Sequence, residues 1–331
     1  MGWLSVCRYR QRVPTVAFTP EHVEAAAQLL ARRHADHRRS EPLLDPAYES
    51  PEVCATDLEA LLRTPDASGA IVLEREGPVA FMLGAPREPS WGDHMWVTAA
   101  GHATQDAEAL RDAYAFAAQR WYDEGRTSHY ALVPVHDAGA LEAWYRLGFG
   151  QMHAHAIRES APMTPVVTDG VLRRPTRDDI DQIVELEFVL PDHQARSPVF
   201  SAGPAWTAEE LRADWEEDID DPKFRHFVIE QDGALLALAT ACAATVSSMH
   251  SGIVGAPDGG FLGHAAVRPE ARGHGYGRAL GEAVIGWSHD QGFASVVNDW
   301  RVTNLLASRS WPRLGWRTTF LRLHRTIGPA G

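Results

Sequence analysis

The sequence predicts an α/β protein built from two copies of one domain. A chain of 331 residues is too long for one average domain and suits two domains of roughly 150 residues each. Patterns typical of helices and of strands alternate along the chain, and the same order of patterns occurs twice. A segment with two prolines at 161–169 separates the two occurrences, so we expect one domain at 13–160 and another at 170–327.

The elements of the first half follow from local patterns. A helix begins at Thr19 and Pro20, a typical N-cap and first helical residue, and continues with apolar residues at helical spacing. Two strands at 69–74 and 79–83 are joined by a turn that contains Gly77. The other elements expected are helices at 56–62, 107–122 and 138–147 and strands at 95–100, 130–135 and 152–157.

The second half repeats this order. Thr176 caps a helix that continues through Leu186, and a capping-box pattern between Thr207 and Glu210 opens the next helix. The segment 190–206 between these helices is long enough for a functional loop, and we expect it to shape a substrate pocket. A hairpin at 227–230 and 234–241, a strand at 262–267 and a helix at 278–290 follow.

Residue matches support the repeat. Residues 73–77 match residues 229–233, which is an offset of 156, and residues 144–149 match residues 311–316, which is an offset of 167. The change in offset places an insertion in the second copy, around 247–259. Two copies of one fold explain these matches better than two unrelated domains do.

Composition and charge exclude several classes of function. The net charge of −13, with no basic stripe to offset it, argues against a nucleic-acid partner. No apolar run approaches the ~20 residues that cross a bilayer, and the start of the chain lacks the apolar core of a signal peptide. Cys7, Cys54 and Cys242 lie far apart and without metal-ligand spacing. We therefore expect a cytoplasmic protein without a membrane or metal partner, and the sequence is compatible with an oligomer.

The most informative stretch is a glycine-rich turn between the strand at 262–267 and the helix that follows. Residues 272–277 read RGHGYG, so several backbone N–H groups at the helix start are left uncovered for a phosphate. The spacing does not fit the GxGxxG of dinucleotide-binding domains, and the GK[ST] of a Walker loop is absent from the sequence. The turn predicts binding of a phosphorylated ligand, and a pyrophosphate fits best.

The residues around this turn resemble a known family. V-x-P followed by R-x-x-G-x-G, with Arg272, Gly275 and Gly277, is similar to the acetyl-coenzyme A loop of the GCN5-related N-acetyltransferases, the GNAT superfamily. A downstream family pattern resembling N-x-x-A-x-x-x-Y-x-x-x-G-F is matched by Asn304, Ala307, Trp311, Gly315 and Trp316. The resemblance covers nearly the whole chain, twice. It implies a tandem GNAT protein in which each half is a mixed, mostly antiparallel sheet flanked by helices.

The resemblance also implies acetyl-coenzyme A as the co-substrate. The backbone at Ala266 and Val267 would pair with the pantetheine arm, and the glycine loop would hold the pyrophosphate. Asn304 would contact the pantetheine arm, a role that is compatible with capping the next helix. The expected cofactor-binding residues are Ala266, Val267, Arg272, Gly273, His274, Gly275, Tyr276, Gly277, Arg278 and Asn304.

The first copy has lost this loop. At the offset of 167, the loop falls on residues 105–110, which read QDAEAL and contain no glycine. Asp106 and Glu108 would place negative charge where the pyrophosphate has to lie. We therefore expect a degenerate first copy that supports the second copy or shapes its substrate entrance.

Acetyl transfer to an amine requires a proton acceptor, because most amines arrive as ammonium ions. His264 is the first candidate, because it lies three residues before Val267, where acidic residues recur in the family. Glu230 and Asp299, each at the end of a predicted strand, are further candidates, and any of the three can instead be structural.

The general acid is open, because Trp311 replaces the family tyrosine. Either the thiolate leaves unprotonated or takes its proton from water, or one of three hydroxyl groups substitutes for the tyrosine. These belong to Tyr276, Ser308 and Ser310.

The sequence thus predicts an acetyl-coenzyme A-dependent N-acetyltransferase that acts on the primary amine of a small acceptor. The negative net charge favours a cationic acceptor, such as an aminoglycoside-like or amino-sugar-like compound. A protein N-terminus is the alternative acceptor. A second class of function, a coenzyme A-binding sensor or interaction module without transfer activity, stays open because the tyrosine is missing.

Overall fold

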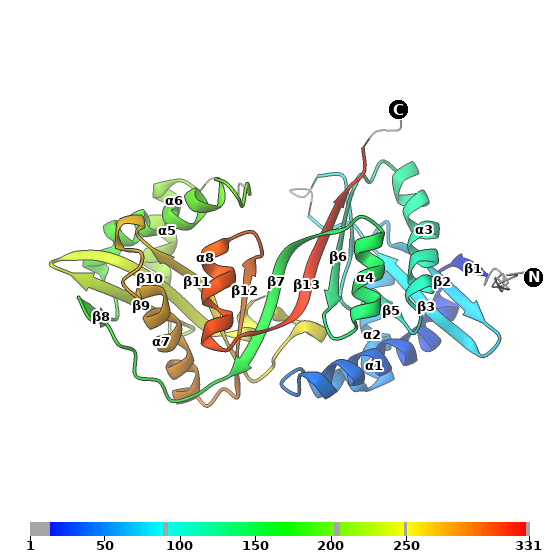
Figure 1. Ribbon diagram of the computed structural model, residues 1–331, viewed down its shortest axis with the longest axis horizontal. Coiled ribbons are helices and arrows are strands. Elements are labelled where there is room, and N and C mark those ends of the chain that lie inside the picture. Colours follow the sequence, from blue (N-terminus) through cyan, green and yellow to red (C-terminus); the bar gives the residue numbers. More distant parts are fainter. Residues whose placement is uncertain (1–13, 89–91, 202–205, 248–249, 329–331) are drawn as a thin grey trace, which may run out of the picture. The chain divides into compact units, whose positions relative to one another are not determined.

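The computed structural model describes residues 14–88, 92–201, 206–247 and 250–328, which form two compact units (Figure 1). One unit comprises the residues up to Ser40, Pro46–Gly150 and the residues from Leu323 on. The other comprises Glu41–Asp45 and Gln151–Arg322. Both contain helices and mostly antiparallel strands, which confirms the predicted fold class. Cys54 and Cys242 are buried free thiols, whereas Cys7 lies outside the described residues.

The first unit contains an antiparallel sheet in the order β1-β2-β3-β5 and a parallel pair of β4 with β6. Its core holds three fully buried tryptophans, Trp96, Trp121 and Trp144. Its elements are β1 (Thr15–Ala17), α1 (Val23–Ser40), α2 (Pro51–Leu62), β2 (Ser68–Glu74), β3 (Gly77–Gly84), β4 (His94–Val97), β5 (His102–Thr104), α3 (Ala107–Asp123), β6 (Ser128–Pro134) and α4 (Ala138–Arg146).

The second unit is built on strands in the order β13-β7-β12-β11-β10-β9-β8. The pairings β8–β9, β9–β10, β10–β11 and β12–β7 are antiparallel, and the pairing β11–β12 is parallel. Its elements are β7 (Gly150–Glu159), β8 (Val171–Arg173), α5 (Ile180–Gln194), α6 (Ala208–Asp218), β9 (Phe224–Gln231), β10 (Ala234–Ala243), β11 (Gly259–Val267), α7 (Tyr276–Asp290), β12 (Ser295–Arg301), α8 (Leu305–Ser310) and β13 (Arg317–Thr326).

Strand β7 ends the first copy in sequence but pairs with β12 over seven residues, from Arg301↔His153 to Ser295↔Glu159. Residues from 151 on are therefore part of the second compact unit, although the sequence repeat assigns them to the first domain. The boundaries 13–160, 161–169 and 170–327 describe the repeat and stay a prediction.

Helices cover β10 and β11 of the second unit and position the site. Helix α5 packs on both strands, and its Ile183 and Leu186 share a buried cluster with Trp215 and Leu238. Helix α7 packs on the same two strands. Helix α5 extends to Gln194 with Pro191 inside it, so the segment 190–206 is not entirely a loop as predicted. Residues 202–205 of that segment lie outside the described residues.

Candidate active site

The site begins where two neighbouring strands of the second unit diverge. The parallel pairing of β11 with β12 runs from Gly259↔Ser295 to Leu262↔Asn298 and stops there. Beyond this point β11 pairs only with β10 and β12 only with β7. One backbone edge of residues 263–267 is therefore left without a strand partner in the described chain. Such an edge can accept an extended ligand as an added strand.

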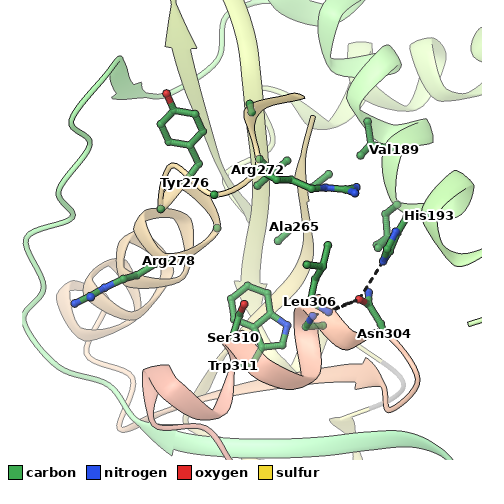
Figure 2. A pocket seen from close by; sticks show the side chains of 18 residues that line it. Val189, His193, Ala265, Arg272, Tyr276, Arg278, Asn304, Leu306, Ser310 and Trp311 are labelled. Atoms are coloured by element: carbon green, nitrogen blue, oxygen red, sulfur yellow. Dashed lines mark hydrogen bonds between the residues drawn. The ribbon is translucent and has the colours of Figure 1, made fainter. Parts of the chain in front are cut away.

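A cavity of about 310 Å³ lies along this edge and at the start of α7 (Figure 2). Strand β11, the glycine loop, helix α8 and the end of α5 all contribute to its wall. It is lined by Val189, Leu190, His193, Ala265, Ala266, Val267, Ala271, Arg272, Gly273, Gly275, Tyr276, Gly277, Arg278, Asn304, Leu306, Ala307, Ser310 and Trp311.

The start of α7 has the properties of an anion site. Its N-cap is Gly275, in the left-handed conformation with φ 82°, and no side chain caps the first turn. Gly273 also has a positive φ, and a Cβ atom at either glycine would meet nothing within 4 Å. The free N–H groups of the first turn therefore face open space at the positive end of the helix dipole. Arg272 lines the cavity and has no carboxylate partner among the described residues.

The structure gathers nine of the ten predicted cofactor-binding residues around this cavity, and only His274 is not part of its lining. Two of the nine use their side chains elsewhere. The Tyr276 hydroxyl donates to the carbonyl oxygen of Asp169 at 2.6 Å, and Figure 2 shows its ring directed away from Asn304. The Arg278 guanidinium pairs with Glu282 at 2.7 Å. These two residues can serve a ligand mainly through their backbone.

Asn304 is held in one orientation by three hydrogen bonds. Its Oδ1 accepts from the backbone N–H groups of Leu306 and Ala307 at 3.2 and 3.3 Å, so it is the N-cap of α8. The same oxygen lies 3.2 Å from Nε2 of His193 (Figure 2). Its Nδ2 has no partner among the described residues, which leaves two N–H donors for a ligand. His193 was not predicted as a site residue, because its link to Asn304 spans 111 positions in sequence.

A second cavity of about 200 Å³ adjoins the first. The two share Leu190, Ala265, Asn304, Ala307 and Trp311 as wall residues. The rest of the second cavity is lined by His153, Gln194, Leu262, Gly263, His264, Asn298, Asp299, Trp300 and Arg301. Of the three predicted catalytic residues, His264 and Asp299 thus lie together and Glu230 does not.

His264 lies on β11, next to Ala265 in the shared wall. Its Nδ1 is 3.7 Å from Oε2 of Glu187, and the other oxygen of Glu187 accepts from Trp215 at 3.3 Å. Its Nε2 is buried and has no partner among the described residues. Glu187 favours a proton on Nδ1, and this leaves Nε2 free to accept one.

Asp299 is a buried carboxylate that binds two imidazoles. Its Oδ2 lies 2.9 Å from Nε2 of His153, and its Oδ1 lies 3.2 Å from Nε2 of His250. Burial alone would raise the pKa of Asp299, but the hydrogen bonds from both histidines outweigh it and hold that pKa well below its usual range. Asp299 therefore positions His153 and His250 rather than presenting a free base to the cavity.

Glu230 lies elsewhere, at the end of β9. Its Oε2 accepts from Nε of Arg173 at 2.7 Å, and the same guanidinium binds both oxygens of Asp179. This ion-pair network ties β8 to β9 and to the start of α5. Glu230 lines neither cavity, so its carboxylate has a structural environment.

The candidate general acids have different surroundings. Trp311 lines both cavities, where its indole N–H is a donor without useful acidity. The Ser308 hydroxyl lies 2.7 Å from the carbonyl oxygens of Val302 and of Asn304, so its proton is engaged. Ser310 lines the first cavity, and its hydroxyl has no partner among the described residues.

In the first unit, a side chain caps the helix start that corresponds to the start of α7. Asp106 caps α3 through Oδ1, which accepts from the N–H of Glu108 at 3.1 Å. Glu108 in turn pairs with Arg111 and Arg146. On β5, Nε2 of His102 lies 3.0 Å from the carbonyl oxygen of Leu132 on β6. In the first unit a side chain thus caps the first helical turn, which has no side-chain cap in the second unit.

Metal-ligand clusters and membrane-spanning helices are both absent from the described residues. These residues contain no group of three or more histidine, cysteine, aspartate or glutamate side chains that could hold a metal ion. No helix among them is long and apolar enough to cross a membrane.

Comparisons with known proteins agree with this geometry. Residues 187–316 match the model of the acetyltransferase (GNAT) family, a range that contains both cavities except His153. No curated protein matches the sequence.

Solved structures share the fold at low identity. A GCN5-related N-acetyltransferase from Sphaerobacter thermophilus is 16% identical with a TM-score of 0.61, over 96% of this chain and 98% of that one. A tandem GNAT protein from the clavulanic acid biosynthesis pathway is 16% identical with a TM-score of 0.50, over 96% and 100%. Residues 187–316 are therefore similar to the GNAT acetyltransferase family, which supports an acyltransferase, and the chain has the fold of a tandem GNAT protein.

Proposed function

We propose that the second unit transfers the acetyl group of acetyl-coenzyme A to the primary amine of a small acceptor. The observation that carries the proposal is the pair of adjoining cavities at the divergence of β11 and β12. The first has an uncapped helix start and a free strand edge, and the second has an unpartnered imidazole nitrogen. The first unit, whose helix start is capped by Asp106, has no part in cofactor binding.

The first cavity fits the parts of coenzyme A in order. The N–H groups at Gly275 to Gly277 and the free Arg272 cation suit the pyrophosphate. The unpaired edge at Ala265 to Val267 suits the pantetheine arm, and Asn304 offers Nδ2 as a further donor. A backbone N–H of this edge, fixed by the sheet, would stabilise negative charge on the thioester oxygen during transfer. Acetyl-coenzyme A itself supplies the activated acyl group.

His264 is the proposed proton acceptor. A primary amine has a pKa near 10 and must lose a proton before its lone pair can attack the thioester carbon. Nε2 of His264 is unpartnered in the wall of the second cavity, one residue from the shared Ala265. His264 takes one proton from the ammonium group, the neutral amine forms the C–N bond, the C–S bond breaks, and the second proton of the nitrogen passes to water. The thiolate leaves without a protein acid and is protonated by water, because a thiol pKa of about 8.5 makes it a stable enough leaving group.

The ligand class is tested by thermal shift. We expect acetyl-coenzyme A and coenzyme A to raise the melting temperature. ATP and NAD at equal concentration should leave it unchanged, because they have no pantetheine arm to pair with β11. Release of free thiol is then followed across a panel of primary amines. Stabilisation by ATP or NAD alone would refute the cofactor assignment. Tight binding of coenzyme A without turnover on any amine would instead indicate the sensor function.

Replacing His264 by glutamine is expected to lower kcat/KM by about 10²- to 10⁴-fold, the usual contribution of a general base. The amide keeps the size and polarity of the ring without accepting a proton, so coenzyme A affinity should not change. The pH–rate profiles of the wild type and the variant should differ, because only the wild type has a base at this position. An identical pH–rate profile in both proteins would remove His264 from the mechanism.

A further inference from the structure

Arg301 is an unpaired cation in the wall of the second cavity. It is the last residue of β12, and its Nε donates to Oε1 of Gln194 at 3.1 Å. Its two Nη groups have no partner in the part of the chain that the structure describes. Burial lowers the pKa of Arg301, and the nearby charge of Asp299 acts in the opposite sense. A partly buried guanidinium without an anion is unfavourable unless a ligand supplies the anion.

Asn298 is a second free donor in the same cavity. Its side chain is 2% exposed, and its Nδ2 is buried without a hydrogen-bond partner among the described residues. A buried donor without a partner destabilises a protein by about 1–3 kcal/mol. Asn298 is the last residue of β12 that pairs with β11, and Arg301 lies three residues further along the same strand. Both donors therefore belong to the strand that diverges from His264.

The only carboxylate in the described lining of this cavity is already in use. Asp299 accepts from His153 and His250 with its two oxygens. Apart from the imidazoles of His153 and His264, the polar side-chain groups of the lining without a partner among the described residues are mostly donors. This suits one anionic group and not the several ammonium groups of a polycation. The expectation of a cationic acceptor came from the net charge of −13, which describes the whole chain and not this cavity.

The volume of the cavity also restricts the acceptor. About 200 Å³ is below the ~300–1,000 Å³ of sites that take drug-sized ligands. A cavity of this size has room for an acceptor with one amine and one anionic group. A planar carboxylate matches the fork of an arginine in a bidentate contact.

We propose that the acceptor is a compact amine with a carboxylate, of the amino-acid class, bound with the carboxylate on Arg301 and the amine toward His264. This inference rests on the proposed acetyl transfer and adds the chemistry of its acceptor. Arg301 comes from β12 and the proton acceptor comes from β11, so the acceptor lies between the diverging strands, beside the wall shared with the first cavity.

The test compares matched acceptors in thiol-release assays with acetyl-coenzyme A. Each amino acid in a panel of α-, β- and ω-amino acids is paired with its carboxamide, which has nearly the same size and no charge. We expect kcat/KM for the best amino acid to exceed that of its carboxamide by about 10- to 100-fold, the range for a hydrogen bond to a charged group. Arg301→Gln should bring this ratio close to one, and Arg301→Lys should give an intermediate ratio.

The control variant is Arg309→Gln, which removes an exposed arginine of α8 that lines neither cavity. It should leave the ratio unchanged, and all variants should keep the coenzyme A-induced thermal shift. Equal or better use of carboxamides and simple amines by the wild type would overturn the inference while leaving acetyl transfer intact. An unchanged ratio in Arg301→Gln would overturn the role of Arg301. Failure of every amine to release thiol would overturn the proposed function as well.

Discussion

Glutamate in place of Gly277 is expected to abolish binding of acetyl-coenzyme A without unfolding the second unit. Gly277 lies in the first turn of α7 and lines the first cavity. A Cβ atom there would meet only Cγ2 of Val267, at the ordinary contact distance of 3.9 Å. A glutamate in the first turn also suits the helix dipole, so the fold should tolerate it.

The loss of binding follows from charge. The new carboxylate would stand where the pyrophosphate has to lie, and two like charges about 4 Å apart repel by roughly 4 kcal/mol at a protein surface. This corresponds to a decrease in affinity of about 1,000-fold. Isothermal titration with coenzyme A measures the affinity, and circular dichroism checks the fold.

Two control variants distinguish the effect of the new charge on affinity from the effect of the added side chain. Gly277→Ala adds the Cβ atom without the charge and should change the affinity by less than about tenfold. Ala107→Gly, at the start of α3 in the first unit, should change nothing, because Asp106 caps that helix. Gly275 is less suitable for this test, because its φ of 82° would strain any side chain. Binding of coenzyme A to Gly277→Glu with unchanged affinity would show that the ligand does not use the start of α7.

The first cavity, which we propose for the cofactor, could be predicted because most of its wall is local in sequence. The glycines at 273 and 275 adopt positive φ values, and such a backbone strongly favours glycine at those positions. The strand before the turn and the helix after it have clear periodic patterns. Nine of ten predicted residues consequently line one cavity. Asn304 was also predictable, because the residue type that caps a helix stands before a helical pattern.

The acceptor side could not be predicted because distant segments form it. Asp299 is on β12, His153 on β7, and His250 lies in the connection between β10 and β11. No spacing in the sequence relates these three residues. Glu230 was chosen for its place at a strand end, but its partner Arg173 lies 57 positions away and gives it a structural environment. Net charge likewise averages over the whole surface and does not report the donors in one small cavity.

Mild acid is expected to destabilise the first unit strongly, because three of its buried histidines are held neutral. Burial lowers the pKa of His37 to about 2, of His102 to about 3 and of His129 to about 4. In the unfolded chain each would titrate near 6.5. Between these values the unfolded state binds more protons than the folded state, so stability falls as the pH is lowered below about 6.5.

The expected loss of stability is large for a small domain. At pH 5.5 each histidine removes roughly 1.4 kcal/mol, so the three together remove about 4 kcal/mol from a typical total of about 5–15 kcal/mol. Urea unfolding at pH 7.5, 6.5 and 5.5 measures the free energy of unfolding. His102→Gln keeps an N–H donor for the carbonyl oxygen of Leu132, to which Nε2 of His102 is now hydrogen-bonded. This variant should lose about 1.4 kcal/mol of the change in stability between pH 7.5 and 5.5, since glutamine takes up no proton in either state. A free energy of unfolding that does not change between pH 7.5 and 5.5 would contradict the neutral state of these histidines.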